Sequence, residues 1–416
     1  MNRSNWARVS LIAAFISAMG HQGMVQAADD TLGLKMASSV KDRVFVRAGA
    51  IHVKVKTKSG ETYDVTGPVI TKAELEALAK YAGGVDPNRA TYIQEALIER
   101  GISPAAATNI NNALQSPING IPLVTNAMTA QGLDALGTPP GITAMAKERV
   151  NTAGISLGAY LTDDYTWIVE AYVLAAPVKT SVTALGPSRI RANDEGQYAR
   201  PFGLQGQKIL STKMLPPIVM LGRYWGDKDA KFRLYTGVAA MYAMFYDTKA
   251  TEALNTYVGG GNPGDTTVSL KNTFGFGPML GVKYQFSDAW HLSMNVGNVK
   301  LRTQGTLTTR NTFLTKDSGA WQDFGLSDFQ YDSDGNLLPG PDVLTISDAI
   351  QTGQTGIAEA GPLSRQAIYA QAGGIVGVVS AGVAKLRGQA NLGTYVRKAD
   401  TELNATMLML SVGRSF

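Results

Sequence analysis

The last sixteen residues, Thr401 to Phe416, read TELNATMLMLSVGRSF. Alternate residues along an extended strand point to opposite faces, and here one face carries Leu408, Leu410, Val412 and Phe416. The other face carries Met407, Met409, Ser411, Gly413 and Ser415. Alternation over about ten residues that ends the chain on an aromatic is typical of the last strand of an outer-membrane β-barrel. Arg414 interrupts the apolar face close to the chain end, where a long cation can reach the lipid headgroups.

The N-terminus supports the same interpretation. Arg3 and Arg8 precede an apolar run from Val9 to Met19, and Val25-Gln26-Ala27 forms a small-residue cleavage pattern. This arrangement predicts a secretory signal peptide at residues 1–27, followed by a periplasmic segment at 28–42 and a barrel at 43–416. The expected location is the bacterial outer membrane, with the lipid bilayer as partner.

Composition excludes several other classes. The formal net charge of +5 falls to +3 when the two signal-peptide arginines are subtracted, and no basic stripe with interleaved aromatics occurs, so nucleic acid is not an expected partner. The chain has no cysteine. Disulfides, thiol nucleophiles and thiolate metal sites are therefore excluded.

Alternation between turn signals predicts an all-β fold, an eight-stranded antiparallel transmembrane barrel. The expected strands are 43–57, 152–162, 166–181, 208–225, 231–247, 270–286, 290–304 and 401–416. Soluble β-sandwiches also alternate, but they rarely repeat outward aromatics at the strand ends. Three connections are tight, at 162–164, 226–229 and 287–289, and outer-membrane barrels place short turns in the periplasm. The long connections then lie outside the cell, and two of them are oversized insertions, at about 58–150 and 305–400.

The insertions are expected to be partly helical. Thr71 and Glu74 form a capping-box pattern for a helix that Gly83-Gly84 ends, and two more helices are expected from Asp86-Pro87 and from Ser103-Pro104. The apolar stretch 367–386 is expected to form a helix over the barrel mouth or a plug, with a transmembrane helix as the less favoured alternative. An Asp-rich run at 332–336 resembles part of a calcium loop, but Val343 stands where the last acidic ligand is needed. We expect no metal and no cofactor.

Catalysis is not expected. The mature chain has two histidines, His52 and His291, and only His291 shares a face with a nearby serine, Ser293. A Ser–His site also needs a third group that orients the base. A histidine in a polar lumen explains this pair more simply, although a hydrolase remains an alternative.

Placed on these strands, several motifs resemble the OmpW family of outer-membrane barrels. The matching pieces are Phe45–Gly49, Leu215-Pro216-Pro217, Tyr224–Asp227, Lys231–Gly237, Ser269–Lys271, the glycines 275, 277 and 281, and the ending Ser411–Phe416. Ser415 stands where that family often has arginine, and the two insertions are much longer than the family's loops. The resemblance implies a hydrophobic channel for passive diffusion of small apolar molecules. The outer-membrane assembly machinery is a further expected partner, through the C-terminal strand.

The alternation also assigns residues to the lumen. An apolar channel lining is expected from Leu215, Tyr172, Leu174, Met241, Phe245, Met279, Met407 and Met409. A charged floor at the periplasmic end is expected from Arg47, Glu170, Arg223, Arg233 and Lys283. Such a floor would bar an apolar solute from the periplasm, and proline cannot donate a ladder hydrogen bond, so we expect a lateral opening to the bilayer at Pro216 and Pro217. The alternatives are a floor that only rigidifies the barrel, and a structural or adhesive barrel that acts through its long loops.

Overall fold

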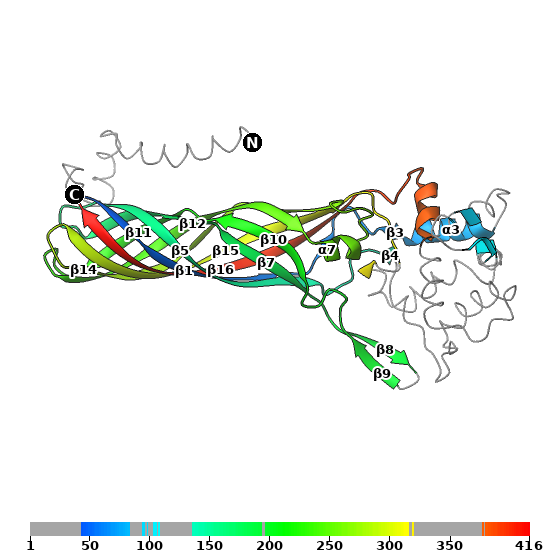
Figure 1. The fold of residues 1–416 in the computed structure, drawn as a ribbon, viewed down its shortest axis with the longest axis horizontal. Helices are drawn as coiled ribbons and strands as arrows, with labels where there is room; N and C mark the ends of the chain where they lie inside the picture. The colour runs from blue at the N-terminus through cyan, green and yellow to red at the C-terminus, as the bar shows by residue number, and fades with distance from the viewer. Residues whose placement is uncertain are drawn as a thin grey trace.

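The computed structural model describes residues 43–83, 135–193, 196–315 and 379–416, with isolated positions at 94–95, 98, 103–105, 107–108, 318–319 and 377. The expected signal peptide, the periplasmic segment 28–42 and the Asp-rich run lie outside these residues. The described chain forms a long barrel with helical segments beyond the end opposite the C-terminus (Figure 1).

The barrel is a closed antiparallel ring. Its strands are β1 (Val44–Ser59), β5 (Thr143–Tyr160), β6 (Trp167–Leu174), β7 (Val178–Leu185), β10 (Lys208–Leu215), β11 (Ile218–Trp225), β12 (Phe232–Ala250), β14 (Thr273–Gln285), β15 (Trp290–Thr309) and β16 (Tyr395–Ser415). β6 and β7 follow one another along one wall, as do β10 and β11, so these ten strands make eight walls. β1 pairs with both β16 and β5, which closes the ring. The expected fold class is confirmed.

Several strands are longer than their alternation indicated. β5 begins at Thr143, β15 continues to Thr309, and β16 begins at Tyr395. A short strand, β13 (Thr266–Leu270), precedes β14 and also pairs with β15. The barrel strands therefore extend into both ends of the ranges 58–150 and 305–400, which were expected to be insertions. Outside the membrane a strand needs no apolar face, so the sequence pattern did not indicate these extensions.

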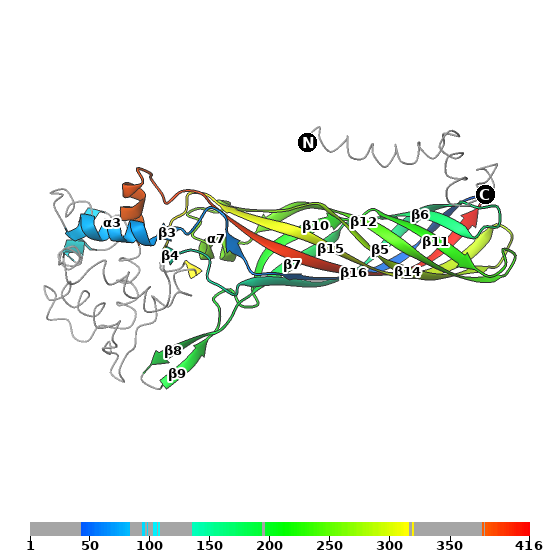
Figure 2. The same cartoon turned by 180° about the vertical axis from the view of Figure 1, so that it is seen from behind.

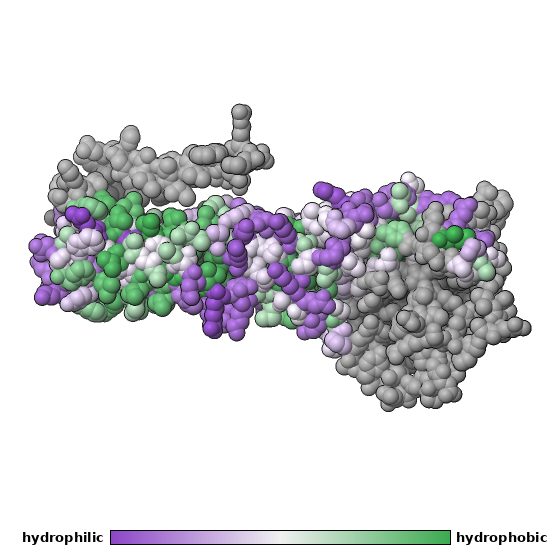
Figure 3. Space-filling view, viewed as in Figure 1, coloured by the Kyte–Doolittle hydropathy of each residue, from purple (hydrophilic) through white to green (hydrophobic). Residues whose placement is uncertain are grey.

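On the face drawn in Figure 3, exposed apolar residues gather at the end of the barrel that carries the C-terminus, and they form an apolar belt there. On β15 the exposed residues Trp290, Leu292, Met294 and Val296 are followed on the same face by Asn298 and Lys300. From Trp290 to Asn298 the strand climbs about 20 Å along the axis at the usual rise and tilt, close to the apolar height of outer-membrane barrels. The rest of β15 therefore projects beyond the membrane.

Smaller elements sit at the outer end. They are β2 (Tyr63–Asp64), which pairs with β16, the two-stranded pairing of β3 (Ile70–Thr71) with β4 (Ala135–Leu136), and α7 (Glu252–Tyr257). A hairpin of β8 (Arg189–Asn193) and β9 (Gly196–Arg200) projects sideways from the barrel (Figures 1 and 2).

Helix α3 (Lys72–Gly83) begins with the expected capping box. The Thr71 N–H donates to Glu74 Oε2 at 2.8 Å, and the Glu74 N–H donates to Thr71 Oγ1 at 3.2 Å. The second and third expected helices lie mostly outside the described residues, although the described positions 94–95, 98, 104–105 and 107–108 are helical.

Only the end of the apolar stretch 367–386 is described, and residues 379–386 are helical. A Cβ built on Gly382 would lie 2.6 Å from a methyl of Leu78, so this segment packs against α3. Arg387, which follows it, forms an ion pair with Glu74. Within the described residues, no helix has the length and apolar character needed to cross a bilayer.

Candidate solute channel

A buried ion pair closes the periplasmic end of the lumen. Arg47 and Glu170 are both 0% exposed, and Arg47 Nη1 lies 2.6 Å from Glu170 Oε2. Arg47 also donates to the Tyr224 hydroxyl at 2.8 Å and to His291 Nε2 at 3.1 Å. The Ser156 hydroxyl donates to the other Glu170 oxygen at 2.5 Å. These bonds join five walls of the barrel.

Two further cations complete this floor. Lys283 donates to the Tyr160 hydroxyl at 2.9 Å, and Arg233 donates to the backbone carbonyls of Tyr165 and Gly226. The Arg233 guanidinium stacks 4.7 Å from the centre of the Tyr224 ring. The structure therefore brings together four of the five residues expected in the floor: Arg47, Glu170, Arg233 and Lys283.

The fifth, Arg223, was assigned to the wrong face. It lies on the outer surface, with its guanidinium 4.6 Å from the centre of the Trp225 ring. Leu215 also alternates toward the outer face, and the neighbouring Met214 is buried in the lumen. The physical reason is the same for both residues. The wall 208–225 is apolar on both faces, so its alternation carries no signal about which side meets lipid.

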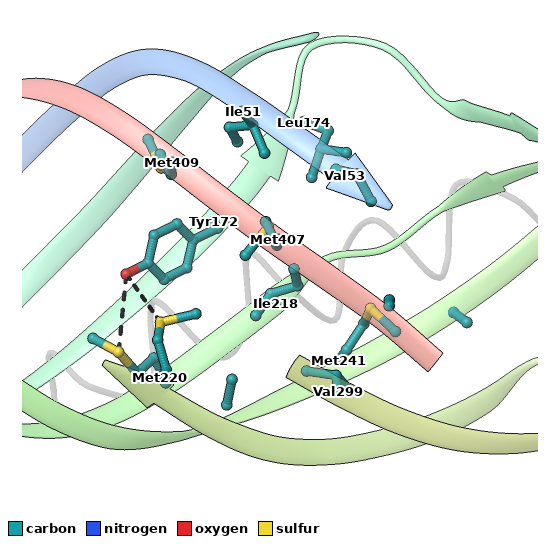
Figure 4. Close-up of a cluster of buried hydrophobic side chains, with 14 of the residues drawn as sticks. Ile51, Val53, Tyr172, Leu174, Ile218, Met220, Met241, Val299, Met407 and Met409 are labelled. Atoms are coloured by element: carbon teal, nitrogen blue, oxygen red, sulfur yellow. Dashed lines mark hydrogen bonds between the residues drawn. The ribbon is translucent and has the colours of Figure 1, made fainter. Parts of the chain in front are cut away.

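A layer of methionines and one tyrosine lies above the floor (Figure 4). The Tyr172 hydroxyl donates to the sulfur of Met279 at 3.7 Å and to that of Met220 at 3.9 Å. Met409 is 0% exposed in the same cluster. Flexible thioethers adapt to neighbours of different shape, so this layer narrows the bore without a rigid polar barrier. The expected lumen residues Tyr172, Leu174, Met241, Met279, Met407 and Met409 all belong to this cluster, and Phe245 packs against it.

Two cavities occupy the bore above that layer. The lower one encloses about 20 Å³ and is lined by residues that include Leu174, Met214, Pro216 and Met407. The upper one encloses about 150 Å³ and is lined by residues that include Phe202, Leu254, Val268, Leu307 and Met214. Met214 lines both cavities, so they adjoin. An apolar cavity of this upper size holds a benzene-sized molecule in other proteins.

Two charged residues, Arg397 and Lys398, line the upper cavity, and Arg397 is the buried one. It is 3% exposed; its Nε lies 3.2 Å from Asp64 Oδ1 and donates to the Thr138 hydroxyl at 3.0 Å. Its Nη1 is buried without a hydrogen-bond partner. Burial lowers the pKa of Arg397, whereas Asp64 raises it. The cavity is thus largely apolar, with the buried Arg397 guanidinium at its wall.

The wall beside the lower cavity is interrupted. Ile218 pairs with Tyr172 and Met214 pairs with Val178, but the residues between them are not paired across this seam. Three residues, 215–217, face five residues, 173–177, and prolines occupy positions 177, 216 and 217. The extra length on one side and the missing N–H groups of proline both prevent a regular ladder.

Residues 175–177, between β6 and β7, also lack regular pairing on their other side, toward β5. β5 pairs with β6 up to Gly154 and with β7 from Met145, which leaves residues 146–153 without strand partners on that side. The Ala175 N–H bonds to the Ala153 carbonyl, and the Ser181 N–H bonds to the Glu148 side chain. The loss of pairing expected at Pro216 and Pro217 is present, and it extends around residues 173–177.

The described residues offer no catalytic arrangement around His291. Its Nε2 accepts from Arg47, and its Nδ1 is buried without a partner, so no third group orients this ring toward Ser293. The Ser293 hydroxyl instead lies 3.4 Å from the Tyr235 hydroxyl. Among the described residues, no three His, Cys, Asp or Glu side chains are grouped as metal ligands.

Sequence reasoning missed the aromatic part of the floor and the upper cavity. Phe45, Tyr160, Tyr224 and Tyr235 share the inward face of their strands with the floor cations, so this face already held a usable signal. The lining of the upper cavity includes residues from connections between strands: Phe202, Leu254 and Tyr257. These connections have no alternating pattern from which lumen-facing residues could be predicted.

Comparison with known proteins places this barrel among its relatives. The model of the OmpW family matches residues 192–318. Outer membrane protein W of Vibrio cholerae is 28% identical over 153 residues, which is 37% of this chain and 60% of that protein. Outer membrane protein W of Escherichia coli is 32% identical over 95 residues, which is 23% of this chain and 42% of that protein. The matches thus span less than two thirds of these relatives.

A solved structure, the outer membrane protein OprG from Pseudomonas aeruginosa, aligns with a TM-score of 0.42 and 12% identity over 90% of this chain and 96% of that one. The family match, the W proteins and the closed eight-walled barrel with its outward apolar belt lead to one conclusion. Residues 192–318 are similar to the OmpW family, and the chain is a β-barrel protein of the bacterial outer membrane.

Proposed function

We propose that this barrel lets small hydrophobic molecules cross the outer leaflet by passive diffusion and releases them sideways into the bilayer. One observation carries the proposal: adjoining apolar cavities lead from the outer end to the interrupted wall at Pro216, while the Arg47–Glu170 floor closes the periplasmic end. The solute is not chemically changed on this route, and the barrel acts without catalysis or a cofactor.

The hydrophobic effect supplies the driving force for entry. A solute that buries about 150 Å² of apolar surface in the upper cavity gains about 4 kcal/mol relative to water. The lower cavity and the adaptable methionines continue this environment inward. The floor cannot accept such a solute, because its charged groups are already paired and would have to be separated to let it pass.

The interrupted wall offers the exit. Opening a regular ladder breaks several backbone hydrogen bonds, each worth about 0.5–1.5 kcal/mol, whereas the seam between residues 173–177 and 215–217 has none to break. The solute leaves an apolar lumen for apolar lipid, so the step has little net cost in transfer free energy. Assembly of the barrel would proceed through recognition of β16 by the outer-membrane assembly machinery.

The test is uptake by liposomes that contain the purified protein. An apolar solute should enter faster than through protein-free liposomes, and a polar solute of equal size should not. The variant P216V/P217V restores two N–H donors, which can stabilise a closed seam by about 1–3 kcal/mol and slow apolar flux by roughly tenfold.

The matched control adds two valines elsewhere in the walls. Ala48 and Ala240 face outward on fully paired strands, so A48V/A240V should transport like the wild type. Equal apolar flux through wild-type and protein-free liposomes would refute the channel, and wild-type flux in P216V/P217V would refute the lateral exit.

A further inference from the structure

Four cations face one another on the outer surface of β1 and β5. In the register of this pair, Lys54 lies opposite Arg149, and Lys56 lies opposite Lys147. All four point away from the lumen, because the neighbouring Val53, Val55 and Ala146 are buried. Like charges directly opposite each other across a sheet are destabilising, so this basic quartet (Lys54, Lys56, Lys147 and Arg149) needs a physical reason.

No carboxylate in the described part of the chain forms an ion pair with the quartet. The adjacent Glu148 points inward and accepts from the Ser181 N–H, and Glu402 of the neighbouring β16 pairs with Arg302 at 2.9 Å. The pKa of Lys54 is lowered, first by the charge of Lys56 and then by those of Arg149 and Lys147. The four charges therefore act on one another without an internal counterion.

The barrel provides its own comparison. Lys179 and Lys213 also lie opposite each other, on β7 and β10. There Asp247 supplies a carboxylate 2.7 Å from Lys213, and Lys249 lies 3.1 Å from the same group. At this second pair of opposed lysines, the carboxylate of Asp247 offsets the positive charge. Among the residues that the structure describes, no acid plays this role for the quartet.

The height of the quartet identifies the missing counterion. On β16 the last exposed apolar residue is Leu408, which pairs with His52, and Lys54 is the next outward residue of β1. Lys54 and Arg149 therefore lie about 5 Å above the apolar belt along the barrel axis, and Lys56 and Lys147 about 10 Å above it. The headgroup region extends roughly 5–8 Å beyond the hydrocarbon, so Lys54 and Arg149 sit at headgroup level. Lys56 and Lys147 lie just above it, and their long side chains reach back to the headgroups.

We propose that the basic quartet binds the phosphate groups of the anionic glycolipid in the outer leaflet, so that one lipid docks on the β1–β5 surface. Its acyl chains would lie along the outward alanines below, Ala50 and Ala153, which are paired with each other and leave room beside the wall. Phosphate oxygens would supply the counterion that the described part of the barrel does not provide, and the Arg149 guanidinium can bind two of them at once.

Thermal unfolding in an uncharged detergent tests this, with added bisphosphorylated lipid A as ligand. Wild-type protein should gain several degrees in midpoint on titration with this lipid, and dephosphorylated lipid A should have little effect. Inorganic phosphate at the same concentration should also have little effect, because it lacks the acyl chains that bring the headgroup to the wall. Equal stabilisation by the dephosphorylated lipid or by inorganic phosphate would overturn the proposal.

The variant K54Q/K56Q/K147Q/R149Q should bind the phosphorylated lipid at least tenfold more weakly. Without lipid it should unfold at the same temperature as wild type or higher, because its internal repulsion is removed. The control K228Q/K231Q/K271Q/K300Q removes the same charge from exposed positions elsewhere and should keep lipid affinity. A quartet variant that folds and still binds at wild-type affinity, or a control that loses binding equally, would refute a specific site.

Discussion

Replacement of Glu170 by glutamine should destabilise the barrel more than any conservative change on its surface. The side chain is 0% exposed and accepts two hydrogen bonds, from Arg47 and from Ser156. A hydrogen bond to a charged group contributes about 1.5–3 kcal/mol to the free energy of unfolding. Glutamine carries no charge, so the weakening of both hydrogen bonds should cost about 3–6 kcal/mol. This range overlaps the 3–5 kcal/mol typical of a buried ion pair that loses one partner.

The second half of the experiment removes both charges. Arg47→Met should cost a similar amount, because it leaves the Glu170 carboxylate buried without its cation. In R47M/E170M no charge remains unpaired, so at least half of the summed loss should be recovered. The Tyr224 hydroxyl and His291 still lose their donor, which accounts for a remaining cost of about 1–2 kcal/mol.

Equilibrium unfolding in urea, followed by tryptophan fluorescence in uncharged lipid vesicles, measures these free energies. Arg223→Gln is the control, because that residue is exposed on the same half of the barrel, and it should cost below about 1 kcal/mol. A loss under about 1 kcal/mol for E170Q, or a double variant as unstable as the sum of the single ones, would refute the floor as a coupled ion pair. Apolar uptake by R47M/E170M should match wild type, since the solute does not pass the floor.

The remaining predictions concern the outer end and the bore. Burial raises the pKa of Glu74, but hydrogen bonds from Arg387 and Thr71 outweigh it and hold the pKa below its ordinary value. A depressed carboxyl pKa adds stability above the unfolded value and loses it as pH falls, so amide-exchange protection of α3 should drop below about pH 4, and E74Q should remove that dependence. Val182→Trp fills the upper cavity and should lower apolar uptake severalfold in liposomes while the circular dichroism spectrum stays unchanged. Because Arg397 Nη1 lacks an acceptor, a hydrocarbon with one terminal hydroxyl should bind about tenfold more tightly than the plain hydrocarbon, measured by displacement of a fluorescent probe; equal affinities would contradict this role.

The sequence predicts which face of a strand meets lipid only where one face is clearly more apolar than the other. The end of β16 and the following Phe416 alternate leucine, valine and phenylalanine with methionine, serine and glycine, and the outward and inward residues there were placed correctly. β11 sets Val219 and Leu221 against Ile218 and Met220, and there the face was inverted, which misplaced Leu215 and Arg223. Once a strand is apolar on both sides, its orientation comes from its hydrogen-bonded neighbours.

Local chemistry along the chain was sufficient for the eight walls, the periplasmic turns, the capping box of α3 and the loss of pairing at Pro216. Each depends on residues close together in sequence, through alternation, turn propensity or a missing N–H group. The basic quartet, the double cavity and the five-against-three seam required the folded ring. They depend on register between strands about 100 residues apart, such as Lys54 with Arg149, and such register is set by closure of the whole barrel.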